Sequence, residues 1–206
     1  MPNLHIESVR TPFDNPRLAS AAIGALTRAD ALGLLSRPVT CLDDSAIQGL
    51  ETGMADAGIG RNFLAELHRL PCSDAARLSS LLEKINEALD QSPAPAHEWR
   101  VLQGILGVDL LTHLLGISQS SARRYIAASR STPDLIAARL HFLAFVVGDL
   151  AGACNDIGVR RWFDRPRERL DGRTPAQVLG HEWSPGDDAP KRVRELARTL
   201  APSPAT

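Results

Sequence analysis

The stretch "LTHLLGISQSSARRYIAAS", residues 111–129, holds two short helical patterns separated by one glycine and a group of serines. The apolar face of the first pattern consists of Leu110, Leu111, Leu114 and Leu115. Gly116 suits the left-handed backbone conformation that ends a helix, and Ser118 is well placed to cap the next one. The spacing therefore predicts two short helices joined by a tight turn, the pattern of a helix-turn-helix.

The second helix of such a pair places its first turns in the major groove of DNA. Ile117, Ala122 and Ile126 are expected to face the protein interior. The residues predicted to contact DNA are Ser118, Gln119, Ser120, Ser121, Arg123, Arg124, Tyr125 and Arg130, with Gln119, Ser120 and Arg123 at base edges. Arginine pairs bidentately with guanine, and glutamine does so with adenine. The alternative interpretation is an ordinary helical hairpin with a solvated basic face.

Helical patterns continue on both sides of this stretch. Before it, "QSPAPAH" at 91–97 is the expected linker, followed by helices at 99–106 and 108–115. After it, a helix is expected from Pro133 to Leu150, with Thr132 as its capping residue. The run "LHFLAFVVG" in this helix is too short to cross a bilayer, so it predicts a buried helix.

The first half of the chain is also mostly helical in pattern. Its first fifteen residues are predicted to form an irregular arm with a short strand in "LHIESV". A helix is expected from Pro16 to Ser36, after which "RPVTCL" interrupts the pattern. Asp43 and Asp44 are predicted to cap a second helix that runs to about Gly58.

The most regular helix of this half follows a short helix that is expected to stop near Pro71. Ser73 is predicted to cap it. Its apolar stripe consists of Leu78, Leu81, Leu82, Ile85 and Leu89. The stripe predicts a helix that faces the core of the protein, and a seam between subunits is the alternative.

Composition places the chain among globular, mainly helical proteins. Hydrophobic residues make up 44% of its 206 positions and aromatic residues only 4%. Residues 1–97 carry 8 basic and 12 acidic side chains, whereas residues 98–206 carry 15 and 12, which suits a second half that meets an anionic partner. The three cysteines are far apart, and the N-terminus lacks the pattern of a signal peptide, so a cytoplasmic protein is expected.

Motifs of catalytic and cofactor sites do not occur in the sequence: it has no GxGxxG, Walker-type phosphate loop, HExxH or GxSxG. The six histidines are scattered singly, without the spacing of metal ligands. The aspartate pairs at 43–44 and 187–188 precede apolar segments, which makes helix capping their expected role. We therefore expect no enzymatic activity and no metal or cofactor.

A second basic stretch, "NDIGVRRWFDRPRERLDGRTPAQVL" at 155–179, holds six of the 23 basic residues. Together with "LLGISQSSARRYI", "STPDLIAARLHFLAFVVGDLAG" and the closing "VRELARTLA", it resembles the Xre/MbcA/ParS antitoxins of RES–Xre toxin–antitoxin systems. The resemblance covers residues 99–200. It depends on the combination of a Trp-Phe pair, an Arg-Pro and Leu-x-Gly-x-Thr-Pro. Residues 1–97 have no counterpart in it.

The resemblance implies an all-α, cytoplasmic protein that forms homodimers or larger oligomers. It implies an Xre-like helix-turn-helix domain at 96–152 and a small helical toxin-binding domain at 153–206. The helical patterns before them predict a separate helical N-terminal region at 1–95. The implied partners are a RES-domain toxin that consumes NAD and double-stranded operator DNA. Such an antitoxin neutralises the toxin and represses its own operon.

The family signature falls on Trp162, Phe163, Leu170, Gly172, Thr174 and Pro175. The residues predicted to bind the partner are Arg160, Arg161, Trp162, Arg165, Arg167 and Arg173. The residues themselves also allow structural roles, because Trp162 and Phe163 suit the core of a small domain. The arginines could instead pair with neighbouring acidic residues on a solvated face.

Two other functions remain open at the level of sequence. One is a stand-alone transcriptional regulator or nucleoid-associated protein that binds DNA without a toxin partner. The other is a structural or assembly protein whose helix-turn-helix only dimerises.

Overall fold

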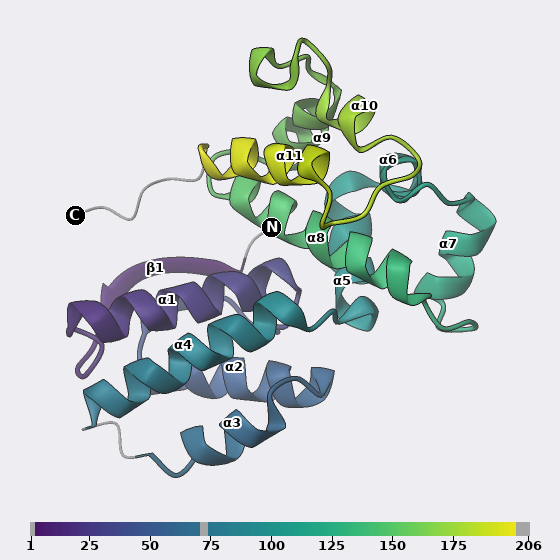
Figure 1. The fold of residues 1–206 in the computed structure, drawn as a ribbon. Coiled ribbons are helices and arrows are strands. Elements are labelled where there is room, and N and C mark those ends of the chain that lie inside the picture. Colours follow the sequence, from purple (N-terminus) through teal and green to yellow (C-terminus); the bar gives the residue numbers. More distant parts are fainter. Residues whose placement is uncertain (1–2, 71–73, 201–206) are drawn as a thin grey trace. The chain divides into compact units, whose positions relative to one another are not determined.

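The chain folds into two compact units, Pro2–Pro93 and Ala94–Thr206, in a computed structural model that describes residues 3–70 and 74–200 (Figure 1). The described residues form eleven α-helices, one 3-10 helix and two strands. The chain is therefore mostly helical, as its composition predicts. The expectation of an all-α protein is confirmed only in part, because the first unit also contains a small two-stranded parallel sheet.

The sheet of the first unit pairs β1 with β2 in parallel, with α1 as the connection between them. The elements of this unit are β1 (Leu4–Val9), α1 (Pro16–Ala31), β2 (Val39–Leu42), α2 (Asp44–Ala57), α3 (Arg61–Leu67) and α4 (Ala75–Gln91). Leu4 pairs with Val39, and Val9 pairs with Leu42. The segment "RPVTCL" thus forms a strand, because the β-branched Val39 and Thr40 suit an extended backbone beside β1.

Most predicted helix ends of the first unit lie close to the observed ones. Asp43 caps α2 through the backbone N–H of Ala46 (3.2 Å), and Gly58 ends the helix with a left-handed φ of 73°. Both features confirm the prediction. The helix expected from Pro16 to Ser36 ends earlier, at Ala31, because the chain turns at Gly33 with a φ of 74°.

The apolar stripe of α4 lies in the core of the first unit. All five of its residues are buried, and α4 packs along α1. The prediction of a core-facing helix is confirmed, and the alternative of a seam between subunits is wrong. Pro71 and Ser73 lie outside the described residues. The capping residue of α4 is Asp74, which accepts a hydrogen bond from the N–H of Arg77.

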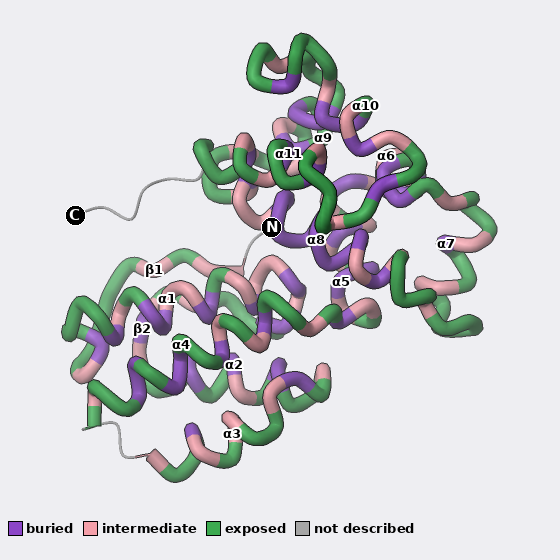
Figure 2. The backbone as a smooth tube through the Cα atoms, viewed as in Figure 1, coloured by how far each residue is buried: buried purple, intermediate pink, exposed green. Residues whose placement is uncertain are grey.

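The second unit is built around α8, whose apolar segment is buried as predicted (Figure 2). The elements of this unit are α5 (Pro95–Leu106), α6 (Val108–Leu115), α7 (Gln119–Ile126), α8 (Asp134–Ala151), α9 (Asp156–Asp164), the 3-10 helix η1 (Glu168–Leu170), α10 (Pro175–Leu179) and α11 (Asp188–Arg198). α8 packs against α5, α6, α9 and α11. This unit is wholly helical.

Two boundaries of the second unit differ from the prediction. The predicted linker 91–97 is shorter in the structure, because Pro95 already occupies the first turn of α5. Thr132 does not cap α8. Its hydroxyl instead accepts a hydrogen bond from Trp99 Nε1 (3.0 Å), and Pro133 precedes the helix. Thr174 does start α10 as predicted, through a capping box with Gln177.

A buried arginine joins three segments of the second unit. Arg139, on α8, is only 6% exposed and donates hydrogen bonds to the carbonyls of Leu115 (2.9 Å), His181 (3.2 Å) and Trp183 (2.6 Å). Its guanidinium also lies over the Trp183 ring, 5.3 Å from the centroid. Burial lowers the pKa of Arg139, and the negative charges of Glu182 and Asp187 oppose that effect. Arg139 therefore satisfies carbonyls that would otherwise be buried without a partner.

We expect Arg139→Lys to destabilise the second unit. Lysine keeps the charge but cannot reproduce the planar fork that reaches three carbonyls, and a hydrogen bond from a charged group contributes about 1.5–3 kcal/mol. Urea unfolding, monitored by circular dichroism, should show that the free energy of unfolding falls by at least this amount. The control is Arg100→Lys, at an exposed position of α5, where we expect a change within about 0.5 kcal/mol. Equal stability of the two variants would contradict this role of Arg139.

We also expect a fragment of residues 94–206 to fold without the first unit. The fragment contains α8 and the helices that cover it, and about 110 residues suffice for an independent core. The fragment should unfold cooperatively in urea and retain the helical signal of α5 to α11. A broad, non-cooperative transition would show that its core is incomplete.

Candidate functional site

The turn between α6 and α7 has the backbone geometry that the sequence predicts. Gly116 ends α6 with a φ of 68°. A side chain at this position would collide with the carbonyl of His181, so glycine is required by space as well as by conformation. Ser118 caps α7 through the N–H of Ser121 (3.2 Å). The predictions for Gly116 and Ser118 are confirmed.

The inner face of α7 packs against α6 and α5. Ala122 is fully buried, and Ile126 is partly buried. The ring of Tyr125 stacks on that of Trp99, with centroids 6.1 Å apart. Tyr125 was predicted to lie among the DNA-contacting residues. Its ring helps to hold α7 on α5.

The outer face of α7 carries the remaining predicted DNA contacts. Arg123, Arg124 and Arg130 are all exposed, and none of them forms an ion pair within the described part of the chain. The Arg124 Nε donates to the carbonyl of Ser120 (3.3 Å). Gln119 donates through its side-chain amide to the carboxylate of Asp109 on α6. The face is thus basic, with one glutamine held at its edge.

Ser118, Ser120 and Ser121 form a small network at the start of this face. The hydroxyl of Ser118 lies 3.0 Å from those of both Ser120 and Ser121. Ser118 and Ser121 therefore serve mainly to start the helix. Ser120 is exposed beside them.

The second predicted interface does not gather all of its residues on one surface. Trp162 and Phe163 are buried, and their rings meet edge to face with centroids 5.2 Å apart. This favours their structural role. Arg160 donates to the carbonyls of Ile105 and Gly104 (3.2 Å for Gly104), which closes the C-terminal end of α5.

Two further arginines are also engaged within the chain. The guanidinium of Arg167 lies over the Trp162 ring, 5.5 Å from the centroid. Arg173 forms a loose ion pair with Asp171 at 3.9 Å. The ring contact holds Arg167 against the core of the loop around η1, whereas the ion pair of Arg173 is exposed to solvent and weak.

Of the arginines predicted to bind the partner, Arg161 and Arg165 are exposed and form no ion pair within the described residues. One turn before Arg161, the side chain of Ile157 is 59% exposed. We call Ile157, Arg161 and Arg165 the α9 patch. Ile157 was not among the predicted residues, although an isoleucine opposite Val159 and Trp162 on an amphipathic helix is a signal that the sequence contains.

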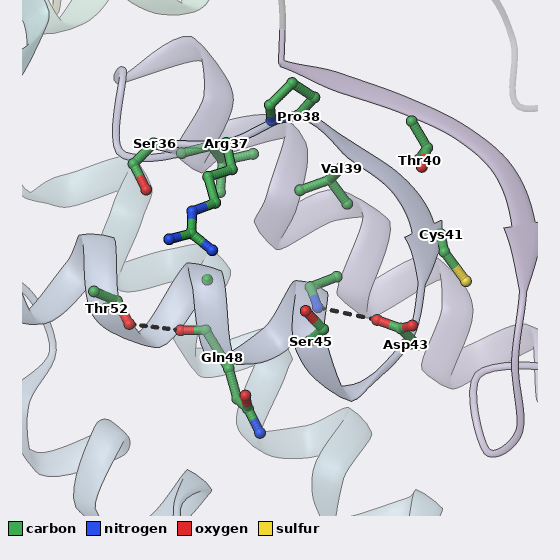
Figure 3. Close-up of a pocket in the computed structure, with 13 residues that line it drawn as sticks. Ser36, Arg37, Pro38, Val39, Thr40, Cys41, Asp43, Ser45, Gln48 and Thr52 are labelled. Carbon is green, nitrogen blue, oxygen red and sulfur yellow. Dashed lines mark hydrogen bonds between the residues drawn. The ribbon is translucent and has the colours of Figure 1, made fainter.

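The first unit contains a cavity of about 460 Å³ that the sequence analysis did not foresee (Figure 3). One wall is the segment 35–43, which includes β2, and the other is the N-terminal half of α2. Arg37, Thr40 and Gly49 are among the lining residues. Gly49 is the available signal, because a glycine inside a helix is costly and often has a reason in packing or function.

Nowhere in residues 3–70 and 74–200 do three or more His, Cys, Asp or Glu side chains gather to hold a metal ion. Over the same residues no single helix has the length and apolar character to span a membrane, and α8 with α9 meets that test only as a pair bent by 116°.

Comparisons of the chain with protein-family models, with curated proteins and with solved structures give no match. The function must therefore be argued from the residues and their geometry.

Proposed function

We propose that the chain is a DNA-binding antitoxin. In this proposal α7 reads an operator, and the α9 patch binds and neutralises a RES-type toxin that consumes NAD. The observation that carries the proposal is the exposed basic face of α7, which follows a glycine turn and a serine cap. Both interfaces act by binding, with no catalytic step.

The chemistry of the α7 face fits DNA better than a solvated hairpin. The three exposed arginines have no acidic partner among the described residues, so their positive charge is available to an anionic ligand. Arg123 lies in the middle of the helix, where its guanidinium can reach a guanine bidentately. In the free protein the side-chain amide of Gln119 donates to the carboxylate of Asp109. On DNA, Gln119 would give up this hydrogen bond and contact the edge of an adenine instead.

A helix-turn-helix protein of this kind reads DNA as a dimer, with half-sites about 34 Å apart. We therefore propose a homodimer or a larger oligomer, bound to a palindromic operator. Contacts between the exposed arginines and DNA phosphates would make the affinity fall as the salt concentration rises.

The α9 patch has the composition of a small protein interface. An exposed isoleucine supplies an apolar anchor, and arginines beside it supply bidentate contacts to carboxylates or fill a site built for phosphates. Arg161 and Arg165 carry this part of the proposal, because they lie beside Ile157 and have no ion pair in the described residues, whereas Arg160 and Arg167 are held by contacts within the chain.

Replacing Arg123 with alanine should weaken binding to the operator by about 1–3 kcal/mol, the contribution of a bidentate base contact. Arg130→Ala should weaken binding to all sequences alike and lower the slope of affinity against salt. Fluorescence anisotropy with the DNA upstream of the gene, at two salt concentrations, measures both effects. Arg100→Ala, on the exposed side of α5, is the control. Salt-independent binding, or equal losses for all three variants, would contradict the assignment.

Replacing Arg161 and Arg165 together with alanine should leave the stability nearly unchanged, because neither side chain has an ion pair to lose. The double variant should fail to protect cells from a RES-type toxin encoded beside this chain. Trp162→Ala should also fail, but through loss of about 3–5 kcal/mol of stability, because it leaves a cavity in the core. Thermal melts and a growth-rescue assay on the same variants separate the two causes.

The control for the rescue assay is Arg169→Ala, a change of the same kind at an exposed arginine outside the α9 patch. Full protection by the double variant would place the toxin surface elsewhere. If no RES-type toxin is encoded nearby and DNA binding persists, the stand-alone regulator becomes the better assignment.

A further inference from the structure

The cavity of the first unit combines buried apolar residues with exposed polar ones. Leu35 and Ala46 are buried among its lining residues, and Val39 is half-buried. From α2, Ser45 and Gln48 contribute a hydroxyl and an amide, both exposed and without a hydrogen bond to the residues that the structure describes. The volume of about 460 Å³ and this mixed lining are typical of sites for small organic ligands.

The charge of the cavity is set by Arg37. Among the described residues, the charged side chains that line the cavity are Arg37 and Asp43. Asp43 is engaged, because its carboxylate caps α2 and lies 3.6 Å from Arg10. Arg37 forms no ion pair in the described part of the chain, and Figure 3 shows its guanidinium extending toward Gln48 and Thr52 of α2. The cavity therefore offers a ligand one uncompensated positive charge.

One position of α2 keeps the cavity open. Gly49 lines it, and a Cβ added there would have no atom within 4 Å, whereas one added at Gly53 would collide with the carbonyl of Leu34. Gly53 is thus explained by the packing of α2 inside the unit. Gly49 is not explained by packing, and it has no positive φ that would require glycine. A glycine inside a helix lowers its stability, and the effect of this one is to leave the wall of the cavity free of a side chain.

We propose that the cavity binds a small organic carboxylate, whose carboxyl group pairs with Arg37 and whose apolar part lies against Leu35 and Val39. The guanidinium presents two parallel N–H donors that match the two oxygens of a carboxylate. One arginine balances the single negative charge of a carboxylate, whereas a phosphate monoester carries about −1.5 to −2. Ser45 and Gln48 can bond to a hydroxyl or amide group of the ligand. The site lies in the first unit and does not depend on the function proposed for α7 and α9.

The test uses benzoate, phenylacetate and mandelate, each compared with its uncharged amide, and phenyl phosphate as the other kind of anion. Each compound is titrated into the full chain, labelled with nitrogen-15, and followed in two-dimensional proton–nitrogen NMR spectra. The carboxylates should shift the backbone amide signals of residues 39–41 and 45–49 together, because these residues belong to the two walls. The uncharged amides should bind about tenfold more weakly, the effect of losing one charge-assisted contact.

A first variant removes the charge. Arg37→Gln keeps a polar side chain at this position and should weaken binding of the carboxylates about tenfold, to the affinity of the uncharged amides. The control is Arg61→Gln, the same change at an exposed arginine of α3 outside the cavity, which should leave the affinity within about twofold.

A second variant fills the space. Gly49→Gln should abolish binding, while its melting temperature should not fall, because glutamine favours a helix more than glycine does. The control is Gly104→Gln, at an exposed glycine of α5 where an added Cβ also has no atom within 4 Å, and it should leave binding unchanged. Circular dichroism melts establish that each variant is folded.

The proposal is overturned if no carboxylate shifts the signals of both walls, or if the uncharged amides bind as tightly as the carboxylates. It is also overturned if Arg37→Gln and Gly49→Gln bind the carboxylates as the original chain does. Tighter binding of phenyl phosphate than of benzoate at these residues would overturn the choice of a carboxylate as the group that Arg37 recognises.

Discussion

The guanidinium of Arg139 is the interaction on which the arrangement of the second unit depends. The last carbonyls of a helix lack partners within it, and Leu115 is the last residue of α6. Arg139 satisfies that carbonyl and, at the same time, two carbonyls of the loop between α10 and α11. Trp183 returns the contact, because its Nε1 donates to the carbonyl of Leu114 (2.9 Å). The end of α6, the middle of α8 and a distant loop are thereby held together.

A second set of polar contacts holds α5, the helix on which α7 rests. At its start, the buried carboxylate of Glu98 accepts from the N–H of Ala94 (3.0 Å) and lies 2.6 Å from His141 Nδ1. At its end, Arg160 binds the carbonyl groups of the last turn. The ring of Trp99 then supports Tyr125. α7 therefore packs on α5, a helix whose two ends are both held by polar contacts.

The sequence predicts this fold where the signal is local. The glycine turn and serine cap of α6 and α7, the stripe of α4 and the Thr174 capping box each depend on a few neighbouring residues, and each is confirmed. The predicted strand in "LHIESV" is β1, but β2 was missed, because it has only four residues and meets its partner strand only after the chain has passed through α1. The roles of the arginines in 155–179 were also not separable by sequence. Arg160 binds the carbonyl of Ile105, which lies 55 residues earlier in the chain, whereas its neighbour Arg161 has no such contact. A pattern of neighbouring residues cannot reveal this difference, because it depends on which distant helix packs nearby.

The hydrogen bonds of Arg139 also set the order in which a growing chain can complete its fold. They join residues separated by 24, 42 and 44 positions. While the chain is being synthesised, α6 and α7 emerge long before His181 and Trp183, which complete the packing behind their turn. A ribosomal product that stops before residue 181 retains the two helices but lacks the backbone and the ring that support them. Premature termination therefore removes the support of the turn between α6 and α7 together with the C-terminal helix α11.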